Sequence, residues 1–195
     1  MSKAILIALV LGIGAGMYIP EIWSAFLDAS SSYMLLILLF CVGIDMGVHR
    51  EVFVQIRRMG LRILVIPLGV VLGSLAGGAL CAMLLQGDVM EGIAITSGLG
   101  WYSLSGILMT EAGNPAGGAI SFLSNVFREV FTFLLVPILA RRNVYVAIAP
   151  AGATAMDTTL PLLSKYTDSQ TAILAFISGV LCTLAVPVLV PFFCI

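Results

Sequence analysis

Seven apolar segments, joined by short connections, occupy almost the whole of this 195-residue chain: about 4–19, 32–48, 63–85, 92–109, 116–140, 145–163 and 171–195. A helix needs about 20 apolar residues to cross a bilayer, and somewhat fewer when flanking side chains reach toward the interface. Hydrophobic residues make up 61% of the sequence and charged residues only 10%. Because a water-exposed surface needs more charges, a soluble enzyme, a nucleic-acid binder and a disordered chain are excluded. The pattern predicts an all-α polytopic membrane protein in which residues 1–195 form one integral membrane domain.

The four cysteines all lie inside apolar segments, without a Cys-x-x-Cys pair or a nearby histidine. A metal site would need clustered nitrogen and sulfur ligands, and a disulfide framework would need exposed loops. We therefore interpret the cysteines as small buried hydrophobic residues. The sequence indicates neither a metal site nor a cofactor.

Two of the seven segments contain residues that interrupt helices. The fourth carries a Ser- and Gly-rich run at 97–106, and the sixth carries a run of Gly, Thr and Pro at 149–161. Such runs free backbone groups that hydrocarbon cannot satisfy, so broken backbone at membrane depth persists only against protein or water. Close helix packing through small residues is the alternative. It does not explain Asp157, which lies between Pro150 and Pro161.

Charge placement predicts the topology, because cytoplasmic loops collect Lys and Arg. If all seven segments crossed the membrane, Arg141 and Arg142 would lie outside the cell. If the fourth and sixth segments enter and leave on one face, the loops on the cytoplasmic side hold eight of the nine cationic residues. We therefore predict about five transmembrane helices, two re-entrant hairpins from opposite faces, a cytoplasmic N-terminus and an external C-terminus. Opposed hairpins of this kind are typical of inverted-repeat secondary transporters.

The fifth segment places charged residues near the centre of the bilayer. An ionised side chain there costs roughly 2.5–3.5 kcal/mol or more, so Arg128 and Glu129 are candidate functional residues. Asn125 and Glu129 share a helix face, whereas Arg128 and Glu129 point about 100° apart and need separate partners. An arginine–carboxylate clamp between helices is the structural alternative.

Asp157 is the second candidate carboxylate, and Thr158 follows it in the interrupted sixth segment. Unwound carbonyls and half-helix ends there can bind cations. If Glu129 and Asp157 face one cavity, burial and mutual repulsion make them candidate proton carriers. A metal site is the alternative, but the absence of an accompanying His or Cys favours a protonatable or organic-cation site.

The interruption of the fourth segment offers groups that suit an amino acid. Trp101 and Tyr102 could cover its apolar or cationic part, and Ser103 and Ser105 could hydrogen-bond its amino-acid end. The alternative for both aromatic residues is a position in the interfacial belt, where amphipathic rings are common.

Taken in order, these motifs closely resemble the LysO-type lysine exporter family: the run 98–106, Arg128-Glu129, Pro137 with Arg141-Arg142, and the run 152–161. The resemblance implies export of L-lysine and its toxic analogue thialysine across the bacterial inner membrane. It also implies an essential pair of intramembrane acidic residues, which the motifs place at Glu129 and Asp157.

Full-length members of that family carry an additional N-terminal portion with further membrane segments. The resemblance therefore implies that this chain corresponds to the C-terminal membrane domain, or to one half of a split exporter. The partners expected on this basis are a second copy of the chain, a small membrane protein supplying the missing portion, or both.

The sequence thus predicts a secondary transporter, not an enzyme, that exports lysine or a related cationic amino acid in exchange for protons, amid membrane lipids and without nucleic acid. Moving one positive charge outward against an inside-negative potential costs about 2.3 kcal/mol per 100 mV, so one returning proton makes the exchange electroneutral. The alternatives are another cation/proton antiporter or organic-ion carrier, an intramembrane hydrolase with a carboxylate dyad, and a non-transporting subunit.

Overall fold

The computed structural model describes residues 63–194 and the isolated positions 11, 14, 30, 33, 37, 40 and 44, and these isolated positions are all helical. The chain divides into two compact units, residues 1–44 and 45–195. The predicted crossings at 4–19 and 32–48 otherwise lie outside the described residues. The interrupted segments and the candidate site residues all belong to the second unit.

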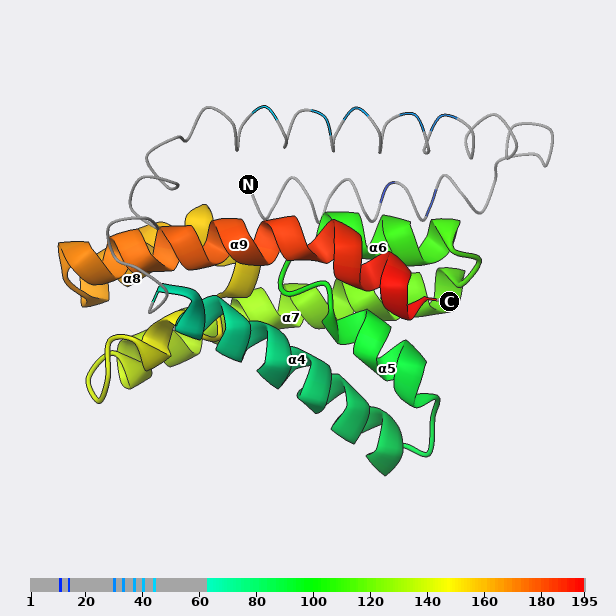
Figure 1. The fold of residues 1–195 in the computed structure, drawn as a ribbon, viewed down its shortest axis with the longest axis horizontal. Coiled ribbons are helices and arrows are strands. Elements are labelled where there is room, and N and C mark those ends of the chain that lie inside the picture. Colours follow the sequence, from blue (N-terminus) through cyan, green and yellow to red (C-terminus); the bar gives the residue numbers. More distant parts are fainter. Residues whose placement is uncertain are drawn as a thin grey trace. The chain divides into compact units, whose positions relative to one another are not determined.

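The described part of the second unit consists of helices, with no strand between residues 63 and 194. In chain order these are α4 (Val65–Leu84), α5 (Val89–Thr96), α6 (Tyr102–Glu111), α7 (Pro115–Leu139), the 3-10 helices η2 (Val146–Ile148) and η3 (Gly152–Met156), α8 (Leu160–Tyr166) and α9 (Ser169–Phe193) (Figure 1). Within this part, α4, α7 and α9 are long and apolar enough to cross a membrane. The all-helical prediction is confirmed here, and the bounds of these three helices lie within two residues of the predicted segments 63–85, 116–140 and 171–195.

The fourth and sixth apolar segments are both interrupted, as their composition predicts. Residues 97–101 separate α5 from α6, and the sixth segment contains only η2, η3 and α8. The backbone turns through the left-handed region in both places, with φ of 50° at Leu99, 104° at Gly100 and 56° at Gly152. Glycine adopts such φ values without steric cost, so Gly100 and Gly152 suit the positions that they occupy.

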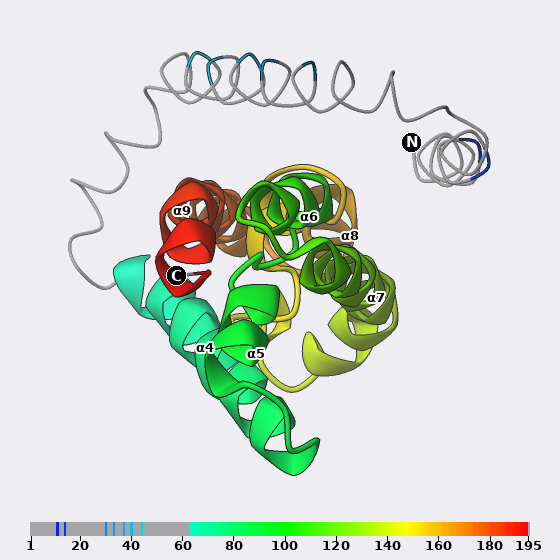
Figure 2. The same cartoon turned by 90° about the vertical axis from the view of Figure 1, so that its right-hand side faces the viewer.

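The two interrupted segments approach each other from opposite ends of the long helices. In Figure 1, α4 and α9 run in the same direction and α7 runs in the opposite one. Both α5 and α6 lie toward the end at which α9 finishes, whereas η2 and α8 lie toward the end at which it begins. Figure 2 looks along the long helices and shows the two interruptions near the centre of the unit. We call them break 1 (residues 97–101) and break 2 (residues 149–159).

Glycines allow the helices around break 1 to pack closely. A Cβ on Gly92 of α5 would lie 2.7 Å from the carbonyl oxygen of Gly78 on α4. A Cβ on Gly118 of α7 would lie 2.6 Å from the carbonyl oxygen of Gly106 on α6. Lipid provides little hydrophobic force between helices, so such close backbone contact contributes much of their association.

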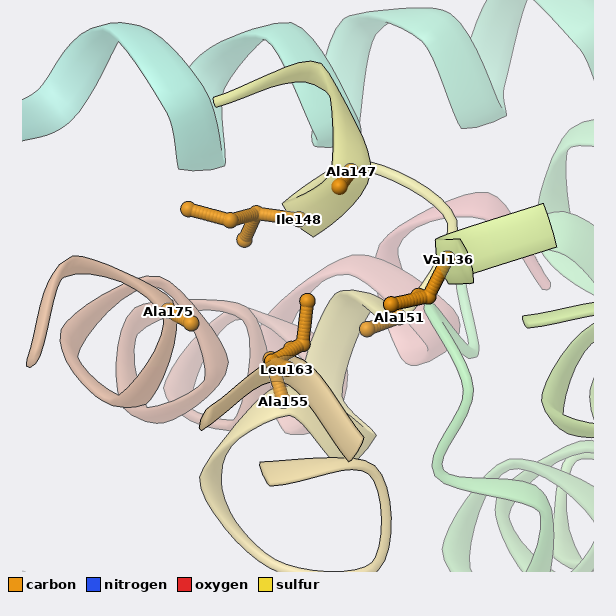
Figure 3. Close-up of a cluster of buried hydrophobic side chains, with 7 residues drawn as sticks. All are labelled: Val136, Ala147, Ile148, Ala151, Ala155, Leu163 and Ala175. Carbon is orange, nitrogen blue, oxygen red and sulfur yellow. The ribbon is translucent and has the colours of Figure 1, made fainter. Parts of the chain in front are cut away.

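Break 2 is held by an apolar cluster at the junction of α7, α8 and α9 (Figure 3). Its buried members are Val136, Ala147, Ile148, Ala151, Ala155, Leu163 and Ala175. Five of these belong to the interrupted segment and α8, so the cluster packs break 2 against two long helices. Most are alanines, which lets the backbone of break 2 approach those helices.

Three helices begin with a side-chain cap. Asp88 accepts a hydrogen bond from Met90 N at the start of α5, and Asn114 accepts one from Gly117 N at the start of α7. Asp168 Oδ1 accepts one from Thr171 N at 2.8 Å at the start of α9. This last bond, to a carboxylate outside the membrane-spanning segments, holds the pKa of Asp168 below its ordinary value. Such caps satisfy N–H groups that the helix itself leaves free.

We expect Gly152→Ala to lower the thermal midpoint of the protein sharply. The new Cβ would collide with the Leu99 carbonyl oxygen and lie 3.0 Å from the Arg128 guanidinium, in addition to the strain of a positive φ. Gly113→Ala is the matched control, because Gly113 has φ of 89° but a Cβ added there would meet no atom within 4 Å. Fluorescence-detected size-exclusion after heating measures both. Equal losses for the two variants would mean that contact between the breaks contributes nothing.

Candidate functional site

Asn125, near the middle of α7, binds the backbone of break 1. Its Oδ1 accepts a hydrogen bond from Gly100 N at 2.7 Å, and its Nδ2 donates to Ser121 O at 2.9 Å. Gly98 is part of the same contact, because a Cβ there would lie within 2.7 Å of Ser105. Asn125 is 2% exposed. The sequence predicted it as a transport residue, and in this structure its amide satisfies backbone that the break would leave free.

Arg128, one turn along α7, binds the backbone of break 2. Its Nε donates to Pro150 O at 2.9 Å, and its Nη2 donates to Ala149 O at 3.3 Å. Its Nη1 donates to Ser74 Oγ on α4 at 2.8 Å. These are carbonyl and hydroxyl acceptors, so the alternative of an arginine–carboxylate clamp is not formed among the described residues. The guanidinium instead joins α7, α4 and break 2.

The two breaks also bind each other directly. Ala153 N of break 2 donates to Leu99 O of break 1 at 2.8 Å. Within break 2, Thr154 Oγ1 donates to Ala151 O at 2.8 Å and lies 3.2 Å from Thr159 Oγ1. These threonines satisfy the interrupted backbone locally, which is how hydroxyl side chains allow breaks in membrane helices.

Glu129 has no such structural partner. Its side chain is only 8% exposed, and it makes no hydrogen bond or ion pair with any described residue. Asp157 ends η3 and is exposed in this chain. Its Oδ1 accepts a hydrogen bond from Thr158 N at 2.5 Å. Thr158 Oγ1 is buried without a well-formed hydrogen bond, close to the same carboxylate.

Tyr102 has an electrostatic interaction with each of the two carboxylates. It is the first residue of α6, and its hydroxyl lies within electrostatic range of both Glu129 and Asp157. Its ring packs edge-on against Phe122 of α7, with 5.5 Å between the ring centroids. The Tyr102 hydroxyl thus interacts electrostatically with one carboxylate from α7 and one from break 2.

The remaining predicted residues divide by exposure. Ser105 is buried, and its Oγ accepts a hydrogen bond from Ser121 Oγ at 3.0 Å, so it belongs to the contact between α6 and α7. Ser103 is exposed, and Trp101 is half-buried at the N-cap of α6.

Two contacts were not predicted from the sequence. Ser74 is the only hydroxyl residue in α4, a signal that could have marked it as a partner for a buried charge. The bond between Ala153 N and Leu99 O has no such signal, because any residue carries these atoms.

Comparison with known proteins identifies the family. The model of the lysine exporter LysO family matches residues 6–194. The chain belongs to this family. It is 39% identical over 166 residues to the Escherichia coli (strain K12) protein named "Lysine exporter LysO", which covers 84% of this chain and 54% of that protein. It is 33% identical over 195 residues to the Haemophilus influenzae protein named "Putative lysine exporter", covering 99% and 96% of the two chains.

The chain thus spans about half the length of the E. coli relative and nearly all of the H. influenzae one. No solved structure matches it. The matching family is described as a lysine exporter family, and three of the described helices are long and apolar enough to cross a membrane.

We expect Arg128→Lys to reduce the amount of folded protein in the membrane several-fold. One ammonium cannot reach Ser74 Oγ, Pro150 O and Ala149 O in the fixed planar arrangement that the guanidinium uses. Arg141→Lys, at an exposed position just after α7, is the control. Quantitative immunoblotting of membranes measures both. Normal abundance of Arg128→Lys would mean that its three bonds are dispensable for folding.

Proposed function

We propose that this chain acts in a secondary transporter that exports L-lysine, and analogues such as thialysine, across the bacterial inner membrane in exchange for protons. The names of both relatives support the cargo. The observation that carries the mechanism is Glu129, a mid-helix residue that is only 8% exposed and whose side chain has no hydrogen-bond partner among the described residues. Placing a charge in such a position costs free energy, and no hydrogen bond or ion pair with a described residue offsets that cost.

Glu129 and Asp157 have a simple part in this exchange. An ionised carboxylate binds the ammonium of the cargo, and a proton arriving from the other side displaces it. The pair of carboxylates therefore holds either cargo or a proton, which is the condition for exchange. Because Asn125 and Arg128 already bind the breaks, they hold the site in shape while the two carboxylates change partners.

The proposed topology has five crossings and two re-entrant hairpins in an inverted-repeat arrangement. The opposite directions of α7 and the pair α4 and α9 support it, because seven full crossings would give all three helices one direction. The approach of breaks 1 and 2 from opposite ends supports it as well. With a cytoplasmic N-terminus, the loop after α7 then lies in the cytoplasm.

A partner protein is also part of the proposal, as a second copy of the chain or as a small membrane protein. Asp157 of break 2 is exposed, and a carboxylate at membrane depth needs protein or water beside it.

We expect Glu129→Gln and Asp157→Asn to abolish thialysine resistance and proton-driven lysine uptake into inside-out vesicles, at near-normal protein levels. Both changes keep size and hydrogen bonding but remove the titratable charge. Asp88→Asn is the matched control, because asparagine also caps helices and Asp88 lies at the exposed start of α5. Wild-type lysine transport by both site variants across a range of pH would refute the exchange mechanism.

We expect cysteines placed at Arg142 and Lys165, in a cysteine-free background, to be shielded from an impermeant thiol reagent in intact cells. A cysteine at Glu111 should be labelled, because the proposal puts the ends of α7 on opposite sides of the membrane. Permeabilised cells show that each position is reactive. Labelling at Arg142 with protection at Glu111 would favour seven crossings.

A further inference from the structure

The first turn of α6 has backbone N–H groups without acceptors at mid-length of the long helices (Figure 1). The N-cap residue Trp101 provides no side-chain hydrogen bond, and the first bond of the helix runs from Ser105 N to Trp101 O at 3.0 Å. The N–H groups of Tyr102, Ser103 and Leu104 therefore have no acceptor among the described residues. Side chains of Asp88, Asn114 and Asp168 cap α5, α7 and α9, whereas α4 and α8 begin without a side-chain cap, as α6 does.

Glu129 follows on the face of α7 that faces break 1 and α6, one turn past Asn125. The two helices run antiparallel, because Ser121 binds Ser105 while Asn125 binds Gly100, which precedes α6. Glu129 follows Asn125 by one turn on the same face, about 6 Å further along the axis and past the first turn of α6. It is buried without a partner, within electrostatic range of the hydroxyl of the first α6 residue. Helix geometry thus places the Glu129 side chain at the level of the N–H groups that begin α6.

We propose that the N-terminus of α6 binds the α-carboxylate of the transported amino acid, while Glu129 and Asp157 bind its ammonium groups. This inference rests on the proposed function. Lysine carries two ammonium groups and one carboxylate, and the site offers two carboxylates and one helix N-terminus, which has a partial positive charge. Arg128 already uses three of its five N–H donors on Ser74 and the carbonyls of break 2, which hold its guanidinium between α7, α4 and break 2.

The consequence is selectivity for an amino acid over a plain amine. Cadaverine lacks the carboxylate of lysine, and lysinamide replaces it by a neutral amide. Both retain a cationic chain for the two protein carboxylates. With either compound, however, the N–H groups of α6 lose their charged acceptor, and a site built to bind a polar group rejects an analogue without it.

The first test uses inside-out vesicles from cells that express the chain, with background from cells lacking it subtracted. We expect unlabelled cadaverine and lysinamide to inhibit labelled lysine uptake at least about tenfold more weakly than unlabelled lysine. Equal inhibition by all three compounds would overturn this inference and leave lysine export standing. An absence of lysine uptake would overturn the proposed function, and this inference with it.

The second test is Ser103→Asp, which places a fixed carboxylate in the first turn of α6. An acidic residue is favourable there for the helix, and Ser103 is exposed. We expect it to weaken inhibition by lysine about tenfold while inhibition by cadaverine is kept or strengthened, so that the preference disappears. Ala116→Asp makes the same kind of change at an exposed position in the first turn of α7 and should keep the preference. A parallel loss for all compounds in Ser103→Asp would indicate a structural effect and contradict the inference; if that variant fails to reach the membrane, the selectivity of the wild type decides.

Discussion

The rest of this structure depends on satisfying the backbone groups that the two breaks leave without intrahelical hydrogen bonds. Each break removes intrahelical hydrogen bonds, and in a membrane no water replaces them. Side chains of one helix satisfy some of these backbone groups, since Asn125 of α7 binds break 1 and Arg128 binds break 2. The breaks then bind each other through Ala153 N and Leu99 O. Local threonines and close glycine contacts complete the arrangement.

This use of α7 separates the polar residues that bind the breaks from one that does not. Asn125, Arg128 and Glu129 lie within two turns, and all are costly at membrane depth. Asn125 and Arg128 offset that cost by hydrogen-bonding backbone groups of the breaks, whereas Glu129 bonds no such group among the described residues. The distinction could not be drawn from residue type, because a buried arginine and a buried glutamate are equally unusual in an apolar segment. It depends on which atoms of the breaks each side chain reaches.

Much of the fold could be predicted from the sequence, because its main signals are long. Apolar length gave α4, α7 and α9 to within two residues, and the Gly, Ser and Pro runs gave both breaks. The roles of single polar residues were harder to predict. Ser105 was predicted to contact cargo, and in the structure its hydroxyl accepts a hydrogen bond from Ser121 between two helices. A serine hydroxyl can hydrogen-bond either a cargo or a neighbouring helix. It is the antiparallel register of α6 and α7 that places Ser105 beside Ser121.

The charges around the breaks give a physical reason for exchange. Arg128 contributes one positive charge, and Glu129 and Asp157 contribute two negative charges when both are ionised. The empty, ionised site then has one excess negative charge in a poorly solvated region, which is unfavourable. One lysine, with its net single positive charge, removes that excess, and so does one proton. A site that holds both lysine and a proton has one excess positive charge, and a site that holds neither has one excess negative charge. Under the proposed mechanism the neutral states are therefore the two in which lysine and proton replace each other, so a one-for-one exchange is the cycle that avoids a charged interior.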